Sequence, residues 1–300
     1  MVAPKPQVFI RTGNKRLFRR DEFDMPYVPD FYRGCVGFIY GSARKAKADS
    51  GFLAMGFVVS VPGTLRPLNR SLYFVTCNHV LDVFRRDVVV RFNTRTGCDS
   101  LSFAKNSFIR KKLLDIAVAP FKLPSGFPIV HIGTETFIKS ADLYDRSIGA
   151  GDDVFMVSRV VLETVRYKQR NIAMLRFGNI ALVPQAEEDF YLVEMRSIAG
   201  HSGSPVFVYS VPSVLGSRRK DELDFAPMFL GINRGHLRDY EQIVDLRSKK
   251  AHPRLVAETN LAMSQVVPAW YIDSVLNENA LKSRRLECET LGPLPEIIED

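Results

Sequence analysis

Short runs rich in Val, Ile, Phe and Tyr recur along most of the chain and are separated by Gly, Pro, Asn or Asp at short intervals. Examples are "FLAMGFVVSV", "SLYFVTCNHVL", "LLDIAVAPF", "SPVFVYSV" and "MFLGIN". β-Branched and aromatic residues between turn residues favour strands, and the helices of about 10–15 residues that alternate with strands in a parallel sheet are missing. The pattern therefore predicts an all-β fold, and it leaves open whether this is a barrel or a sandwich.

One segment near the end of the chain has a different pattern. In "VPAWYIDSVLNENALKSRR", Pro268 fits the first turn of a helix, and Trp270, Tyr271, Val275 and Leu281 recur at an approximately helical spacing. We therefore expect a C-terminal helix. The longest apolar stretch, "GFLAMGFVVSVPG", is far shorter than the ~20 residues that a membrane-spanning helix needs, so no membrane partner is expected.

Charge and cysteine content limit the expected partners and compartment. The net charge is +8 at pH 7, but the Lys and Arg residues are dispersed among probable loops, so a nucleic-acid partner is not expected, whereas attraction to an acidic partner stays open. Cys35, Cys77, Cys98 and Cys288 are widely spaced and form no CxxC pair, which favours reduced thiols. Because the first residues also lack the apolar core of a signal peptide, we expect a cytoplasmic protein.

The run "IAGHSGSPVF", residues 198–207, concentrates groups suited to nucleophilic chemistry. Gly200 and Gly203 flank Ser202 and permit a tight turn in which backbone N–H groups converge, and Pro205 then directs the chain into a strand. A serine hydroxyl needs a base, an acid that orients the base, and donors for the oxyanion that forms. The run supplies the serine and the donors, and the base and acid must come from elsewhere.

His79 and Asp115 are the candidates for the base and the acid. His79 follows an apolar strand in "YFVTCNHVL", although a histidine that only caps a strand fits the same pattern. Asp115 lies within the apolar run "KKLLDIAVAPF", where a buried carboxylate needs a partner such as an imidazole N–H. A carboxylate that faces a loop is the alternative for Asp115.

In this order, "TCNHV", "LLDIAV" and "GHSGSPVF" resemble the histidine, aspartate and serine segments of the chymotrypsin-like (trypsin-like) serine peptidases. The resemblance covers about residues 35–275 and is closest to the disulfide-free bacterial branch with a G-x-S-G-S-P motif. It implies two six-stranded antiparallel β-barrels with a C-terminal helix. It also implies that Ser202 is the nucleophile, His79 the general base and Asp115 the orienting acid, and that the backbone N–H groups of Gly200 and Ser202 hold the oxyanion.

The resemblance also suggests a division of the chain into four parts. These are an N-terminal arm (1–30), a first barrel with His79 and Asp115 (31–135), a second barrel with Ser202 and the C-terminal helix (136–280), and an acidic tail (281–300).

The chain departs from the secreted members of this family at the residue before the nucleophile. His201 stands where they carry the aspartate that pairs with a freed N-terminal ammonium, so that activation switch cannot operate here. The resemblance further implies a substrate pocket near Arg196, Asn233 and His236. A cation at this pocket predicts a preference for an acidic or polar side chain before the cleaved bond.

The sequence therefore predicts a cytoplasmic serine endopeptidase that acts on protein or peptide substrates through an acyl-enzyme and needs no cofactor. A metal site is not expected, because the five histidines show no ligand spacing. Two alternatives stay open. One is a catalytically silent binding or scaffold module with the same fold, and the other is a latent peptidase regulated by a partner protein, with the arm or the tail covering the site.

Overall fold

The computed structural model describes residues 28–145, 148–159, 170–187, 189–209, 227–245 and 247–291, together with the backbone of two short strands near the N-terminus. The chain divides into two compact units, 1–30 and 31–300. In the first unit, β1 (Phe9–Ile10) and β2 (Phe18–Arg19) form an antiparallel pair. In the described ranges, no helix is long and apolar enough to cross a membrane.

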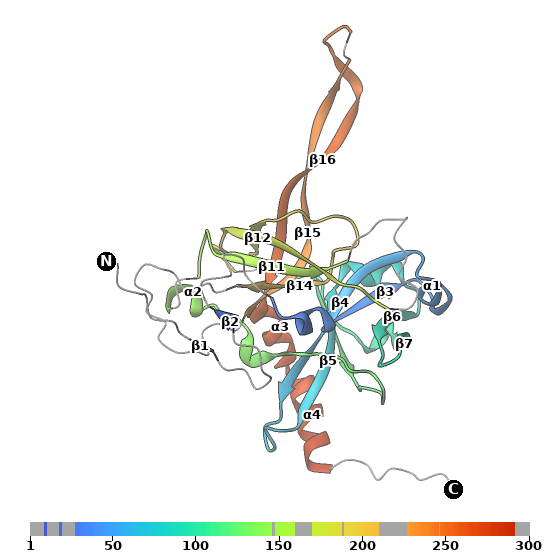
Figure 1. Cartoon of the computed structure of the whole chain (residues 1–300), viewed down its shortest axis with the longest axis vertical. Helices are drawn as coiled ribbons and strands as arrows, with labels where there is room; N and C mark the ends of the chain where they lie inside the picture. Colours follow the sequence, from blue (N-terminus) through green and yellow to red (C-terminus); the bar gives the residue numbers. More distant parts are fainter. Residues whose placement is uncertain are drawn as a thin grey trace. The chain divides into compact units, whose positions relative to one another are not determined.

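The first half of the larger unit is an eight-stranded sheet (Figure 1). Its path runs β7-β6-β3-β4-β5-β9-β8, and β10 pairs in parallel with β4. The strands are β3 (Val36–Tyr40), β4 (Phe52–Pro62), β5 (Arg70–Cys77), β6 (Asp87–Asn93), β7 (Cys98–Ala104), β8 (Ile109–Lys111), β9 (Ile116–Phe121) and β10 (Ile132–Gly133). Fully buried aromatic rings, among them Phe57, Phe74 and Phe92, fill its core.

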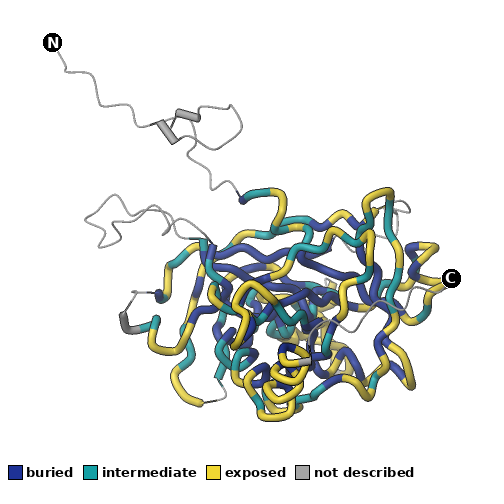
Figure 2. The backbone as a smooth tube through the Cα atoms, turned by 90° about the horizontal axis from the view of Figure 1, so that it is seen from below, coloured by how far each residue is buried: buried dark blue, intermediate teal, exposed yellow. Residues whose placement is uncertain are grey.

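The second half is a closed six-stranded barrel in the order β11-β12-β13-β16-β15-β14. Its strands are β11 (Asp153–Ser158), β12 (Met174–Leu182), β13 (Tyr191–Glu194), β14 (Ser204–Val208), β15 (Met228–Val244) and β16 (Ala251–Pro268). Side chains such as Val154, Met156, Val206 and Leu230 pack inside it. Figure 2 shows the buried residues along the strands in the interior of the larger unit, with exposed residues at the turns.

Short helical segments connect the strands. They are η1 (Asp30–Gly34), α1 (Ala43–Ala48), η2 (His79–Val83), η3 (Lys105–Ser107), η4 (Thr134–Thr136) and α2 (Asp142–Asp145). The last strand leads into α3 (Ala269–Leu276) and α4 (Asn279–Leu291). Helix α4 is fixed to the first half, because the buried Glu289 accepts hydrogen bonds from the backbone N–H groups of Thr64 and Leu65 at 2.9 and 2.7 Å.

The predicted all-β class, with a barrel in the second half and a helical C-terminus, is confirmed. The first half has eight strands instead of six and is a half-barrel, because β8 and β10 are too short to leave a clear signal in the sequence. Helix α4 continues past residue 280 into the segment expected to be an acidic tail. The predicted cover of the site by the arm or tail falls mostly on residues outside the described ranges.

The strand expected from "MFLGIN" is much longer than the motif. β15 and β16 have 17 and 18 residues, and they pair with each other from Gly231↔Pro268 to Val244↔Ala251. Only the first part of β15 belongs to the barrel wall, because its pairing with β14 ends at Asn233. The remainder forms a two-stranded hairpin that extends away from the barrel (Figure 1).

Candidate active site

Two neighbouring strands of the first half bring His79 and Asp115 together. β5 ends at Cys77 and β9 begins at Ile116, and these two residues are partners in the antiparallel pairing of the strands. The residues just outside this pair must therefore lie side by side. This is why a histidine after one apolar run meets an aspartate before another, 36 residues later.

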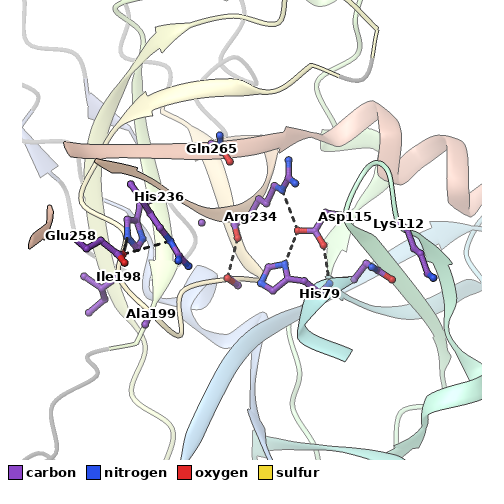
Figure 3. A pocket seen from close by; sticks show the side chains of 13 residues that line it. His79, Lys112, Asp115, Ile198, Ala199, Arg234, His236, Glu258 and Gln265 are labelled. Carbon is purple, nitrogen blue, oxygen red and sulfur yellow. Dashed lines mark hydrogen bonds and ion pairs between the residues drawn. The ribbon is translucent and has the colours of Figure 1, made fainter. Parts of the chain in front are cut away.

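The Asp115 carboxylate holds His79 through two hydrogen bonds. His79 Nδ1 lies 2.7 Å from Asp115 Oδ2, and the backbone N–H of His79 donates to Asp115 Oδ1 at 2.8 Å (Figure 3). The Asp115 side chain is only 6 % exposed, whereas that of His79 is 49 % exposed. Asp115 also has a φ of 56°, a left-handed conformation that is strained for a non-glycine residue. The imidazole is thus fixed on one side and open to the pocket on the other.

The loop that carries Ser202 is fixed against the first half. The backbone N–H of Met55 in β4 donates to the Ser202 carbonyl at 2.9 Å, and the Gly203 N–H donates to the Asn233 carbonyl at 2.9 Å. Gly203 has a φ of 87°, and a Cβ at this position would lie 1.9 Å from the Met55 carbonyl oxygen. Only glycine fits both the conformation and the space.

Ser202 and His79 line one pocket of about 580 Å³, together with residues of both halves. No hydrogen bond between their side chains is found in the described part of the chain, since the Ser202 hydroxyl donates to the Arg234 carbonyl at 3.0 Å. Within the same ranges, the backbone N–H groups of Gly200 and Ser202 have no hydrogen-bond partner. The pocket therefore combines a hydroxyl and an imidazole, and the loop that carries the hydroxyl has two free N–H donors.

His201 is fully buried behind this loop. Its Nε2 lies 2.9 Å from the Arg159 carbonyl oxygen, and its Nδ1 accepts a hydrogen bond from the Ile198 N–H at 3.4 Å. Burial lowers the pKa of His201 to about 4, and nearby Arg176 and His236 contribute in the same direction. The neutral tautomer with its proton on Nε2 satisfies both contacts. A neutral imidazole thus supports the loop where secreted members of the resembled family carry an aspartate.

Arg159 connects this histidine to the first half. Its guanidinium pairs with Asp49 at 2.8 Å and donates to the Tyr40 hydroxyl. It also lies over the Phe38 and Phe52 rings, at 5.0 and 4.7 Å from their centres. All these groups are buried or partly buried. The ion pair and the ring contacts therefore offset the cost of burying the Arg159 charge. The backbone carbonyl that accepts from His201 therefore belongs to a firmly held residue.

The three residues expected in the substrate pocket lie in different places. His236 lines the pocket, and its Nε2 is 3.7 Å from Glu258. Asn233 does not line it, because its buried side-chain amide donates to the His201 carbonyl and to the Ser197 hydroxyl at 2.9 and 3.1 Å. Arg196 is exposed and also lies outside the pocket lining. The structure therefore brings His236 to this pocket, but not Asn233, which supports the loop, nor Arg196.

Cys77, His79 and Asp115 are the described residues whose donor atoms are grouped as in a metal site, within 4.8 Å of one another. The fit to a metal is poor. Burial raises the pKa of the Cys77 thiol well above its usual value, which disfavours a thiolate ligand. The His79 Nδ1 and the Asp115 carboxylate are also already bonded to each other.

Arg234 was not expected at the site from the sequence, and it contacts both the acid and the nucleophile. Its Nε is 3.5 Å from Asp115 Oδ2, and its carbonyl accepts from Ser202. The Asp49–Arg159 pair was not expected either. The only available signals were a cation directly after the apolar "MFLGIN" run and an aspartate in the turn "KADSG".

No family model matches the chain, and no curated protein matches it. Among solved structures, a mutant of the tobacco etch virus protease is similar at 10 % identity, over 85 % of each chain, with a TM-score of 0.43. The catalytically active tobacco etch virus protease in complex with product is similar at 10 % identity, over 85 % of this chain and 83 % of that chain, with a TM-score of 0.44. The serine endoprotease from Yersinia pestis is similar at 12 % identity, over 88 % of this chain and 69 % of that chain, with a TM-score of 0.43. With its half-barrel, closed barrel and C-terminal helices, the chain has a trypsin-like two-barrel fold.

Proposed function

We propose that this protein is a serine endopeptidase that cleaves protein or peptide substrates. The observation that carries the proposal is the pairing of His79 with the buried Asp115 in the pocket that also contains Ser202. A buried carboxylate behind an exposed imidazole is the arrangement that orients a general base and stabilises its protonated form. The two free N–H groups of Gly200 and Ser202 supply donors for an oxyanion.

In the proposed reaction, the Ser202 Oγ attacks the carbonyl carbon of the substrate while His79 Nε2 takes the hydroxyl proton. The oxyanion binds to the N–H groups of Gly200 and Ser202. His79 then gives its proton to the leaving amine as the peptide C–N bond breaks, which leaves an acyl ester on Ser202. Water activated by His79 hydrolyses this ester and restores the serine.

The Ser202 hydroxyl must turn before this reaction, because it now donates to the Arg234 carbonyl. A substrate backbone N–H that bonds to this carbonyl would displace the hydroxyl and free it to donate to His79. Productive geometry at a catalytic serine often forms only with substrate bound. The proposal therefore includes a serine that is aligned by the substrate.

We also propose that the substrate carries an acidic or polar side chain near the cleaved bond. The pocket lining includes several cationic side chains, and the carboxylates that face them are those of Asp115 and Glu258. The cationic residues are Lys112, Arg234 and Arg238, with His236 beside them. An anionic substrate group gains from this excess of positive charge, whereas a Lys or Arg side chain is repelled.

Labelling with a fluorophosphonate probe tests the nucleophile. Wild-type protein should label, and Ser202→Ala should lose the label completely. Ser204→Ala is the matched control, because Ser204 lies two residues later, at the start of β14, and is fully buried. It should keep labelling at the wild-type rate. Labelling that persists in Ser202→Ala removes Ser202 from this role.

A second candidate function is a catalytically silent binding module. The observation in its favour is the hydrogen bond of Ser202 to Arg234 instead of His79. This candidate predicts that the purified protein neither labels nor cleaves any member of a proteome-derived peptide library. Cleavage of that library, lost in Ser202→Ala, excludes it.

A further inference from the structure

The outer part of β15 has an edge without a strand beside it. The pairing of β14 with β15 ends at Ser204↔Asn233, and from Arg234 to Val244 the described residues pair β15 with β16 alone. The backbone groups on this edge are therefore open to another chain. A long unpaired edge is a template for the addition of an extended strand, and natural proteins usually shorten or cover such edges.

The outer hairpin also exposes apolar side chains. These are Tyr240, Ile243, Val244, Leu255, Val256 and Leu261, each between 41 and 58 % exposed. A two-stranded hairpin by itself is only marginally stable in water, and a third strand would add both hydrogen bonds and apolar contacts. The open edge and the apolar side chains thus have the character of a binding surface.

This edge begins at the candidate active site. Its first residue, Arg234, accepts the hydrogen bond from Ser202, and Arg234, His236 and Arg238 all line the pocket. Figure 3 shows Arg234 beside Asp115 and His236 beside Glu258 along the same stretch. Tyr240 is the cross-strand partner of Glu258, which also lines the pocket, so the pocket-facing side of the hairpin continues outward at Tyr240.

We infer that the outer β15–β16 hairpin docks an unfolded acidic segment of the substrate that lies N-terminal to the cleaved bond. The direction follows from the topology. β15 runs outward from Arg234 to Val244, so an antiparallel partner runs inward and brings its C-terminal end to Ser202. The seven residues Arg238–Val244 offer an edge of roughly 20 Å, at about 3.4 Å per residue.

The charge of the hairpin tip identifies the chemistry of this segment. Residues 245–254, "DLRSKKAHPR", contain four Lys or Arg residues and one acid, and Arg247, Lys249, Lys250 and Arg254 are all exposed. The acid, Asp245, accepts hydrogen bonds from the backbone N–H groups of Arg247 and Ser248 within the turn. Positive charge thus lies at the two ends of the edge, in the pocket and at the tip, whereas the strand between them carries the exposed Asp239 and Glu241. The two ends favour an acidic partner.

The inference rests on the proposed peptidase function, so its test separates docking from catalysis. The probe is fluorescently labelled β-casein, an unfolded acidic protein. Its Kd is measured by anisotropy with full-length Ser202→Ala protein, which cannot cleave it, in low and in high salt. The variants combine Ser202→Ala with Tyr240→Ser and Val256→Ser, or with Lys249→Glu and Lys250→Glu. The rate of fluorophosphonate labelling is measured with the same hairpin changes in the Ser202 protein.

Each pair of hairpin changes should raise the Kd for β-casein about tenfold, since a few central contacts carry most of the affinity of an interface. The labelling rate should stay within about twofold of wild type, because these residues lie outside the reacting groups. High salt should weaken binding to wild-type hairpins and have less effect on the Lys249→Glu/Lys250→Glu hairpin.

The matched controls lie away from the hairpin. Leu68→Ser removes a side chain that is 97 % exposed between β4 and β5, and Arg44→Glu with Lys47→Glu reverses exposed charges on α1. Both should leave the Kd for β-casein unchanged, and equal losses of affinity in controls and hairpin variants overturn the inference.

An unchanged Kd in the hairpin variants also overturns the inference. Two further results would overturn the inference. One is a dimer, seen by sedimentation, that dissociates when the hairpin is changed, and the other is binding of the hairpin to phosphatidylserine vesicles but not to β-casein. If protein with Ser202 intact is not labelled by the fluorophosphonate but β-casein still binds to the hairpin, the peptidase function is rejected and the docking surface is retained.

Discussion

Two histidines on opposite sides of the candidate site have opposite environments. His79 comes from the first half, is about half exposed, and has a buried carboxylate on its Nδ1. His201 comes from the second half, is fully buried, and has a backbone carbonyl on its Nε2. The first environment suits the general base of the proposed reaction, because a carboxylate is bonded to one ring nitrogen and the other side of the ring is exposed. The second resists a proton, because burial and the nearby cations Arg176 and His236 make a charged imidazole costly.

One residue type is therefore suited to two separate tasks in this protein. His79 is suited to proton transfer, whereas His201 is suited to fixing the shape of the loop that carries Ser202. The support for that loop runs from His201 to Arg159 and on to Asp49 in the first half. His201 needs no cation to hold the loop, because its neutral ring bonds to the Arg159 carbonyl and to the Ile198 N–H. We therefore expect a loop that is formed without any cleavage of the chain.

The largest effect is expected on the proton-transfer side. Asp115→Asn should lower kcat/KM for peptide hydrolysis by about 10⁴-fold, since the amide favours the wrong tautomer of His79 and no longer stabilises its protonated form. Steady-state hydrolysis of a peptide substrate and the fluorophosphonate labelling rate both measure it. Asp82→Asn is the control, because Asp82 lies nearby but is exposed and pairs with Arg110. A loss in Asp115→Asn no larger than in this control contradicts the assignment.

The expected effect on the supporting side is smaller. His201→Ala should lower kcat about 10²–10³-fold with little change in KM, because the N–H donors of Gly200 and Ser202 lose their fixed geometry. His201→Gln should recover part of this loss, since its side chain can both donate to the Arg159 carbonyl and accept from Ile198. His131→Ala, at an exposed histidine, serves as the control. If kcat and KM are unchanged in His201→Ala, the loop is held by its other bonds to Met55 and Asn233.

The sequence indicated the grouping of His79, Asp115 and Ser202 better than the support of the loop that carries Ser202. His79, Asp115 and Ser202 end or begin apolar runs, and the pairing of those runs in strands brings them to one pocket. The role of Asn233 could not be predicted, because its partners Ser197 and His201 are neighbours only through the fold. The length of the β15–β16 hairpin was also missed, since exposed strands with charged residues lack the apolar run that signals a buried one.

The burial of His201 should make the free energy of unfolding depend on pH. The pKa of His201 is about 4 in the folded protein and about 6.5 when unfolded, so between these values the unfolded chain binds more protons. The stabilisation by neutral His201 is therefore complete above pH 6.5 and is lost as the pH falls toward 4, by about 3 kcal/mol in total. Urea unfolding at pH 7 and pH 4.5 measures most of this loss. The His201→Gln protein has no titrating group at this position. Between pH 7 and pH 4.5 its free energy of unfolding should therefore fall by about 3 kcal/mol less than that of the wild type, because the carboxylates titrate equally in both proteins. Equal pH dependence in the two proteins would show that His201 is already accessible to protons in the folded state.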